Sequence, residues 1–322
     1  MAVTSPPMQV AGQRAPRTPR ARRGLLAEIR RHWADYLYVA PALLVMLIVI
    51  GYPIVYTVYL SFFSTPPSSA NWYPNGVENY QRILSDPGIG FWDTTKNTIY
   101  WTFFSTACSF VLGFGAALVV HRQFPGRGLI RGVLLIPYII SQVPAAFIWR
   151  WLYHSDYGLI SGTLREFGLI ARPIHFLDST QLALASVTVV NIWKEFPFAM
   201  VLLLAGLQTV PEGLLRAARV DGAGSLQAFW HVIVPHLRNV ILVATILLFV
   251  TNLNSFTLVW LMTGGGPANA SAIWITKVYT LAFQDLQYGR ASAFAVILFG
   301  IMLVFGYFYV KALTGGQGRR EA

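Results

Sequence analysis

Two ionisable side chains interrupt a long apolar stretch, and they are the first residues whose types suggest chemistry. Lys194 and Glu195 lie near the middle of residues 181–207, which are otherwise largely apolar. A charge in an apolar region is costly, so both side chains are expected to face a bundle interior or water. Phe198 follows Lys194 by one helical turn and shares its face, where the ring would be available to a ligand.

A second polar cluster, made of Thr251, Asn252 and Ser255, interrupts residues 240–262. At helical spacing these three side chains gather on one side. Amide and hydroxyl groups, together with an aromatic ring, are what a pocket for a polar ligand requires. The alternative is that the two charged residues pair with a second subunit and only hold helices together.

Patterns typical of catalysis or metal binding are missing from the sequence. Its one cysteine, Cys108, excludes a disulfide framework and a Cys-based metal site. The six histidines are scattered along the chain. The phosphate loop that cradles ATP, Gly-x-x-x-x-Gly-Lys-Ser/Thr, does not occur. The sequence therefore predicts neither an enzyme nor a cofactor bound by this chain.

The elements that position these side chains are predicted to be membrane helices. Only 11% of the residues are charged, whereas soluble domains carry about 25%. About 20 apolar residues cross a bilayer. The predicted spans are Tyr36–Phe62, Asn97–His121, Leu129–Tyr153, Gln181–Leu207, Val240–Met262 and Ala291–Leu313. Prolines inside them, such as Pro137 and Pro144, indicate a packed bundle in which neighbouring helices satisfy the freed carbonyls.

Positive charge is unevenly distributed, and this predicts the orientation of the chain. Most of the 24 Lys and Arg residues fall in residues 1–35, 122–128 and 208–239 and in the C-terminal tail. Because Lys and Arg favour the cytoplasmic side, both termini and the 208–239 loop are predicted to be cytoplasmic. The formal charge of +11 is then a topology signal, helped by anionic lipid, and not a nucleic-acid patch.

The same pattern predicts an all-α integral membrane protein in three parts. Residues 1–35 are rich in Pro and Arg and are expected to form a disordered cytoplasmic tail. Residues 36–313 form the six-helix membrane domain, and residues 314–322 a second cytoplasmic tail. The loops expected outside are 64–96, 154–180 and 263–290.

The long cytoplasmic loop, residues 208–239, has the pattern of a bent pair of short helices. Thr209 is predicted to cap the first helix, with Glu212 three residues later as in a capping box. Gly222 is predicted to end it in left-handed geometry, and Ser225 to cap the second helix. An apolar stripe follows, made of Leu226, Phe229, Trp230 and Ile233. Such a pair is either an inert connector or a docking element for a soluble partner.

This loop resembles the EAA loop of ATP-binding-cassette importer permeases. The match comprises Arg216, Ala217, Ala218, Asp221, Gly222 and Ala223, followed by Phe229 and Pro235. The family usually has Glu where this chain has Arg216. The substitution predicts an exposed ion pair between Glu212 and Arg216, worth a few tenths of a kcal/mol.

Further motifs extend the resemblance over residues 36–312. They include Tyr52-Pro53, Val77-Glu78-Asn79-Tyr80, Asp156-Tyr157-Gly158, Trp193-Lys194, Leu204-Ala205-Gly206-Leu207-Gln208, the segment from Leu261 to Pro267, and Gly289-Arg290-Ala291. The last two are similar to the carbohydrate-import branch that includes the larger permease of the maltose transporter.

The resemblance implies a type I importer permease in a prokaryotic plasma membrane that takes up a sugar or oligosaccharide by alternating access. It implies three partners: a second permease, an external substrate-binding protein, and a cytoplasmic ATPase dimer that binds ATP and magnesium. The second permease is expected to be a different chain, and a homodimer of this chain is the alternative. The loop at 208–239 would couple the ATPases to the membrane helices. The implied substrate path comprises Lys194, Glu195, Phe198, Thr251, Asn252 and Ser255. The alternatives are a permease for glycerol phosphate esters and an ion-coupled secondary transporter.

Overall fold

The computed structural model describes residues 33–66 and 71–315, and these residues are mostly helical. The first elements are α2 (Trp33–Met46), the π-helical segment η1 (Leu47–Gly51), α3 (Tyr52–Leu60), β1 (Phe63–Ser64), β2 (Tyr73–Pro74) and α4 (Glu78–Ser85). The next are α5 (Phe91–His121), α6 (Arg127–Ile139), α7 (Gln142–Leu152), α8 (Leu159–Glu166) and α9 (Ala183–Leu207). The last are α10 (Glu212–Val220), α11 (Ser225–Ala228), η2 (Phe229–Ile233), α12 (Val234–Leu253), α13 (Thr257–Thr263), α14 (Trp274–Tyr279), η3 (Thr280–Gln284) and α15 (Tyr288–Gly315).

The membrane-spanning helices agree with the prediction in number but not in shape. Within the described residues, five helices are long and apolar enough to cross a membrane, and α6 with α7 makes a sixth if that bent pair is one span. The pair is bent by 94°, so the third predicted span is a broken helix. The fifth predicted span also breaks, because α12 ends at Leu253 and α13 begins at Thr257.

The chain divides into two compact units at residues 55 and 56. The described part of the first unit comprises α2, η1 and the start of α3. Pro53 is the second residue of α3, two positions after the π-helical segment ends at Gly51. A wider turn of this kind accommodates a proline that lacks an N–H group. The predicted tails at 1–35 and 314–322 lie almost wholly outside the described residues and remain predictions.

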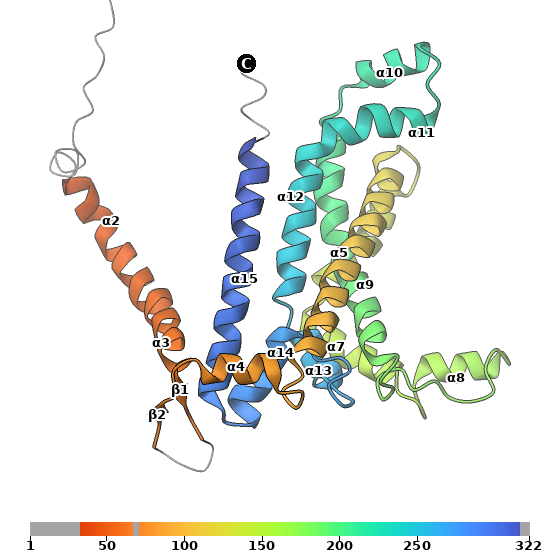
Figure 1. The fold of residues 1–322 in the computed structure, drawn as a ribbon. Coiled ribbons are helices and arrows are strands. Elements are labelled where there is room, and N and C mark those ends of the chain that lie inside the picture. Colours follow the sequence, from red (N-terminus) through yellow and green to blue (C-terminus); the bar gives the residue numbers. More distant parts are fainter. Residues whose placement is uncertain (1–32, 67–70, 316–322) are drawn as a thin grey trace, which may run out of the picture. The chain divides into compact units, whose positions relative to one another are not determined.

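The centre of the second unit is a close pair of helices, α5 and α9, with α12 alongside (Figure 1). The face of α5 toward α9 carries small residues, and Gly113 is the tightest point. A Cβ atom there would lie 2.5 Å from Cβ of Ala199 and 2.6 Å from the carbonyl oxygen of Phe196. Membrane helices associate by such close packing, because lipid tails give no hydrophobic drive between helices.

The ends of the second unit are joined by a clamp around Asn79 in α4. Its amide nitrogen donates to the carbonyl oxygens of Ser61 and Phe63, each at 2.9 Å. The backbone N–H of Gly289, in α15, donates to the hydroxyl of Thr65 at 2.8 Å. A Cβ at Gly289 would collide with the carbonyl oxygen of Phe63. Two sequence motifs far apart in the chain therefore form one contact.

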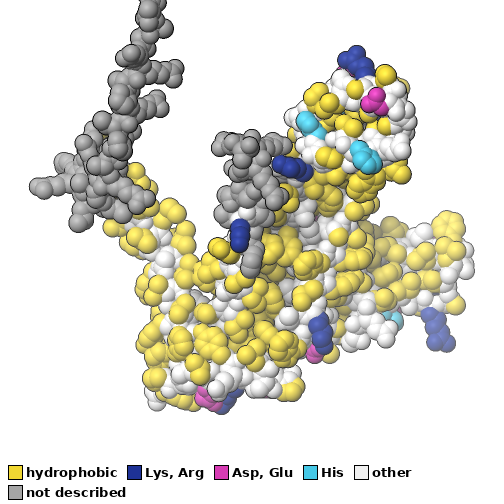
Figure 2. Space-filling model, turned by 45° about the horizontal axis from the view of Figure 1, so that its top comes forward, with side chains coloured by type: hydrophobic (Ala, Val, Ile, Leu, Met, Phe, Trp, Pro, Cys, Tyr) yellow, Lys and Arg dark blue, Asp and Glu magenta, His cyan; other side chains and the backbone are white. Residues whose placement is uncertain are grey.

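The surface of the helices is mostly apolar. In Figure 2, hydrophobic side chains cover most of the visible face, and few charged side chains interrupt it. Exposed apolar residues of this kind on long helices are expected when the surroundings are hydrocarbon and not water. The architecture is that of an all-α membrane protein.

Candidate functional site

A cavity of about 450 Å³ opens where α6 breaks from α7. It is lined by Tyr138, Ile139, Ile140, Ser141, Gln142, Lys194, Glu195, Phe198 and Thr251. The break supplies the first five of these residues, α9 the next three and α12 the last. The cavity therefore lies where three membrane-crossing elements meet, at a point where one of them is interrupted.

Pro144 explains why the helix breaks at this point. Pro144 has no N–H group, so the carbonyl of Ile140, four residues earlier, loses its helical donor. The carbonyls of Pro137 and Tyr138 also lack helical donors, because α6 ends at Ile139. Free carbonyls inside a membrane are costly unless the protein supplies a donor.

Lys194 is the donor that closes the break. Its Nζ lies 2.7 Å from the carbonyl oxygen of Ile140 and 3.4 Å from those of Pro137 and Tyr138. The side chain is 5% exposed. A cation at the carboxyl end of a helix is also favoured by the helix dipole. Lys194 thus holds α9 against the broken span within one chain.

Two aromatic rings form one wall of the cavity. Tyr138 and Phe198 stack with their centroids 5.8 Å apart and an interplanar angle of 26°. Nζ of Lys194 lies 5.9 Å from the centroid of the Tyr138 ring, within range of a cation–π contact. Rings exposed to a pocket in this way suit stacking on an apolar ligand face.

Glu195 is buried but faces the cavity. Its side chain is 6% exposed and lines the cavity wall. Among the described residues, no hydrogen-bond donor reaches its carboxyl group. A buried carboxylate without donors can accept hydrogen bonds from a ligand.

The structure brings four of the six predicted path residues together and places two elsewhere. Lys194, Glu195, Phe198 and Thr251 line the cavity. Asn252 is 1% exposed. Its amide oxygen accepts from Asn191 at 2.7 Å, and its nitrogen donates to the hydroxyl of Thr106 at 3.1 Å.

Asn252 thus ties α9 and α5 to α12 in a closed network and does not reach the cavity. Its carbonyl oxygen takes part too, because the indole of Trp101 donates to it at 3.0 Å. Ser255 lies in the break between α12 and α13, and its buried hydroxyl has no partner among the described residues. Sequence spacing predicted that Thr251, Asn252 and Ser255 share one side, whereas the structure turns Thr251 to the cavity and Asn252 to α5 and α9.

The sequence missed the cavity residues supplied by the break. Tyr138, Ser141 and Gln142 line the cavity, yet none follows a pattern that points to a ligand. The signal that was present is Pro144, which lacks an N–H group and so frees the carbonyl of Ile140.

The second candidate region is the predicted docking pair, now seen as α10 and α11 with η2. The backbone N–H of Ala223 donates to the carbonyl of Ala218 at 2.9 Å, and that of Gly222 to Arg219 at 3.1 Å. This is the Schellman pattern of helix termination. Gly222 has φ of +80° and Asp221 is the C-cap. The prediction that Gly222 ends the helix in left-handed geometry is confirmed.

Both predicted N-caps in this loop are wrong. Thr209 does not cap α10, because its hydroxyl donates to the carbonyl of Gly206 at 2.7 Å in the preceding helix. The N-cap is Pro211, which makes no side-chain hydrogen bond. Gly224, not Ser225, is the N-cap of α11, and the side chain of Gln227 accepts its N–H at 3.0 Å.

The two short helices bury little of their own surface. No residue of α10 or α11 is buried. The most exposed apolar side chains are Val220 at 88%, Leu226 at 71% and Trp230 at 58%. Phe229 packs inward on Phe114 of α5, with centroids 5.3 Å apart. The apolar stripe therefore anchors the pair at Phe229 and Ile233 and leaves Leu226 and Trp230 open.

Three predicted residues of the loop remain to be placed: Arg216, Ala217 and Pro235. Arg216 pairs with Glu212 at 3.8 Å, and both side chains are mostly exposed, which confirms the predicted ion pair. Ala217 lies in the middle of α10, and its carbonyl accepts the N–H of Asp221 at 2.9 Å. Pro235 is the second residue of α12, two positions after the π-helical segment ends at Ile233.

Comparison with known families matches the second half of this architecture. Residues 109–320 match the family described as the binding-protein-dependent transport system inner membrane component. The match begins in α5 and so includes the cavity, the α10–α11 pair and α15. It covers well over half of the chain.

Individual relatives match nearly the whole chain. The sulfoquinovosyl glycerol transport system permease protein SmoG of Agrobacterium fabrum is 34% identical over 86% of this chain and 89% of its own. The trehalose/maltose transport system permease protein MalF of Thermococcus litoralis is 32% identical over 89% of this chain and 94% of its own. The trehalose transport system permease protein SugA of Mycobacterium tuberculosis is 34% identical over 88% of this chain and 90% of its own.

Solved structures share the fold. A chain from a bacterial ABC transporter involved in the import of the acidic polysaccharide alginate superposes with a TM-score of 0.75 at 22% identity, over 92% of this chain and 98% of that one. The relatives, the family match and the helical architecture agree with one another. This chain is a multi-pass membrane permease that belongs to the family of binding-protein-dependent transport system inner membrane components.

Proposed function

We propose that this chain is the permease subunit of an ATP-driven importer and forms part of the translocation path for an uncharged sugar or oligosaccharide. The observation that carries the proposal is the cavity at the α6–α7 break, which combines stacked aromatic rings with a buried carboxylate. Rings stack on the apolar faces of sugar rings, and the carboxylate accepts from hydroxyl groups. Two relatives whose names include trehalose support this substrate class.

The charge of the cavity favours an uncharged substrate over an anion. Lys194 is the only cationic side chain in the lining, and its ammonium group is committed to three backbone carbonyls. An anion would therefore meet the carboxylate of Glu195 without a free cation, which is unfavourable in a low-dielectric site. A glycerol phosphate ester, as an anion, is not favoured.

The α10–α11 pair is proposed to couple this path to ATP hydrolysis on separate subunits. Its exposed apolar side chains suit insertion into a groove of a soluble partner. With both termini and this pair in the cytoplasm, the partner is a cytoplasmic ATPase that binds ATP and magnesium. Closure of two such ATPases would move the pair and switch the cavity between the two sides of the membrane.

Two further partners complete the proposed importer. One is a second permease that supplies the rest of the path, because the cavity in this chain is open on one side. The other is an external binding protein, and a similar alginate transporter has been solved with its substrate-bound periplasmic protein.

The decisive experiment measures ATP hydrolysis by the reconstituted complex, with and without a sugar-loaded binding protein. Stimulation by the loaded binding protein is expected. Sugar uptake driven by an ion gradient, with no ATP hydrolysis, would instead support a secondary transporter. Testing an uncharged disaccharide beside its phosphorylated form examines the charge argument separately.

Orientation is tested by cysteine labelling on a Cys108→Ala background. A Ser225→Cys variant should react with a membrane-impermeant thiol reagent only after the membrane is opened, because α11 is proposed to be cytoplasmic. A matched Ser179→Cys variant, in the loop before α9, should react in intact cells. Labelling of Ser225→Cys in intact cells would reverse the proposed topology.

A further inference from the structure

A short helical arm projects sideways from the second unit, and no part of the proposed transport path uses it. The arm consists of α8 and the turn that follows it, residues 159–172. In Figure 1, α8 runs across the direction of α9 and α12 and extends beyond them, at the level where α7 ends. A helix in this direction lies parallel to the plane of the membrane that its neighbours cross.

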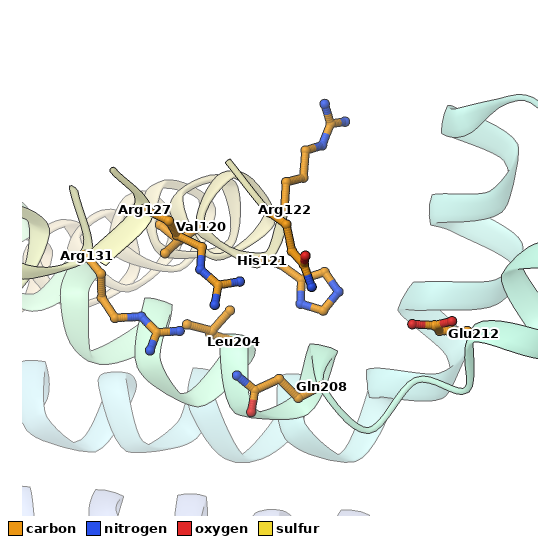
Figure 3. A pocket seen from close by; sticks show the side chains of 9 residues that line it. Val120, His121, Arg122, Arg127, Arg131, Leu204, Gln208 and Glu212 are labelled. Carbon is orange, nitrogen blue, oxygen red and sulfur yellow. The ribbon is translucent and has the colours of Figure 1, made fainter. Parts of the chain in front are cut away.

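Charged side chains mark the two ends of the membrane-crossing region. Figure 3 shows His121, Arg122 and Arg127 where α5 ends and α6 begins, at the end of the bundle proposed to be cytoplasmic. At the other end, Arg150 lies in the last turn of α7. Because α8 begins at Leu159, shortly after α7 ends, the arm lies at the level expected for the opposite membrane surface.

The root of the arm is fixed to the bundle. Ile160, in the first turn of α8, packs against the hydrophobic cluster that contains Trp101 and Tyr153. Ser161, the next residue, is 3% exposed. Phe176, in the segment that returns toward α9, packs against the same cluster. The arm therefore leaves the bundle in a defined direction, and only its outer part is open.

The outer part of the arm exposes large apolar side chains in an ordered turn. Phe167 is 76% exposed and Leu169 is 70% exposed. The N–H of Gly168 donates to the carbonyl of Arg165 at 3.0 Å, and that of Leu169 to the carbonyl of Leu164 at 2.9 Å. This is the Schellman pattern of helix termination. The backbone of the turn is thus satisfied by its own hydrogen bonds, whereas its apolar side chains lack a covering surface within the described residues.

The apolar and the basic side chains of the arm lie on different sides. Figure 2 turns the upper side of Figure 1 toward the viewer, and hydrophobic side chains cover most of the visible side of the arm, at the right, with Lys and Arg at its lower edge. That visible side faces along the membrane-crossing helices, toward the hydrocarbon. Helical geometry agrees, because Arg165 and Phe167 are two residues apart and point in nearly opposite directions.

We infer that the arm lies in the external surface of the bilayer, with Phe167 and Leu169 among the acyl chains and Arg165 toward the headgroups and water. The bilayer surrounds the bundle at this level, and an apolar side with a basic opposite side is the pattern of an interfacial helix. The assignment to the external leaflet rests on the proposed orientation. Held in this way, the arm would keep the end of α7 at a constant depth while the α6–α7 break changes shape during transport.

The test measures the depth of the arm with spin labels. Phe167→Cys and the matched control Arg165→Cys are each introduced on the Cys108→Ala background, and the complex is reconstituted in vesicles of phosphatidylethanolamine and phosphatidylglycerol. A label at position 167 should collide several-fold more often with oxygen, which concentrates in hydrocarbon, than with a water-soluble nickel complex. A label at position 165 should show the opposite preference. Leu169→Cys should behave like Phe167→Cys.

Three results would overturn the inference. Preference for the nickel complex at all three positions would place the arm in water, and preference for oxygen at all three would place it wholly inside the hydrocarbon. Few collisions with either reagent at positions 167 and 169 would mean that protein, either the second permease or the binding protein, covers the apolar side. Binding-protein-stimulated ATP hydrolysis, measured on the same vesicles, and labelling of Ser179→Cys test the proposed function and orientation independently of depth.

Discussion

Two interruptions of helical structure in this chain are closed in opposite ways. At the α6–α7 break, three backbone carbonyls are satisfied by Lys194, which reaches across from α9. At the α10–α11 turn, the freed carbonyls are satisfied by the N–H groups of Gly222 and Ala223 in the turn itself. The first closure connects distant parts of the chain, whereas the second is local.

The difference follows from the surroundings of each interruption. Inside a membrane no water is available, so a broken helix needs a donor from elsewhere in the protein. In water a local turn is sufficient, and unpaired groups are hydrated. A side chain at the membrane break should therefore matter for the stability of the whole bundle, and the glycine in the turn only for the direction of a projecting element.

The largest effect is expected for Lys194→Met. The substitution removes the hydrogen-bond donor shared by three backbone carbonyls. Each hydrogen bond contributes about 1 kcal/mol, so the free energy of unfolding should fall by about 3 kcal/mol. Fluorescence-monitored thermal unfolding of the purified permease measures this loss. Lys194→Arg keeps a donor and should lose less. A Met variant as stable as the unaltered chain would show that water or another group closes the break.

The next largest effect is expected for Gly222→Leu, which should lose transport while its amount in the membrane stays unchanged. The left-handed backbone costs a residue with a Cβ about 1–2 kcal/mol, although no atom lies within 4 Å of the added Cβ. The α10–α11 pair should therefore change direction while the bundle stays folded. Sugar uptake and the amount of permease in the membrane, measured together, separate a misdirected α10–α11 pair from an unfolded bundle. Gly222→Asn is the control, because Asn tolerates this left-handed geometry, and it should keep sugar uptake. Normal uptake by the Leu variant would refute a coupling role for the pair.

A smaller effect is expected for Phe198→Ala, which removes one of the stacked rings in the cavity. Aromatic contacts of this kind contribute about 0.5–1.5 kcal/mol, so apparent affinity for the sugar should fall about 2- to 13-fold with assembly intact. Asn252→Ala is the informative contrast. Its amide is buried in the α5–α9–α12 network, so it should lower the unfolding temperature and leave apparent affinity unchanged.

The smallest effect is expected for Arg216→Glu. Both side chains of the ion pair with Glu212 are mostly exposed. Such pairs contribute a few tenths of a kcal/mol to stability. The unfolding temperature should hardly change. Co-purification with the ATPase subunits then decides between the two interpretations of Arg216. Normal recovery means that it pairs only with Glu212, and reduced recovery means that it meets an acidic partner residue.

Much of the fold could be predicted because membrane helices are specified by composition. The number of spans and Gly222 as a helix end follow from single stretches of sequence. The break at Ile140 could not be located in this way, because whether a proline kinks, ends or breaks a helix depends on which donor reaches the freed carbonyl. That donor, Lys194, is more than fifty residues away and looked from its spacing like a ligand-binding group.

The helices that carry the candidate site could be predicted, but the direction in which each side chain points could not. Thr251 and Asn252 are adjacent, yet one lines the cavity and the other is fully buried. A difference of 100° around a helix decides this, and the packing of α5 and α9 sets which direction is inside. The prediction of Thr209 as an N-cap was wrong because its hydroxyl donates instead to a carbonyl of the preceding helix, that of Gly206.

The clamp around Asn79 has a consequence for how the chain is made. The contact between Thr65 and Gly289 joins residues 224 positions apart. At about 5–20 residues per second, a ribosome needs roughly 10–45 s to synthesise the intervening chain. Until then the hydroxyl of Thr65 lacks this donor. The start of the second unit therefore gains this contact only once the first residues of α15 have been made.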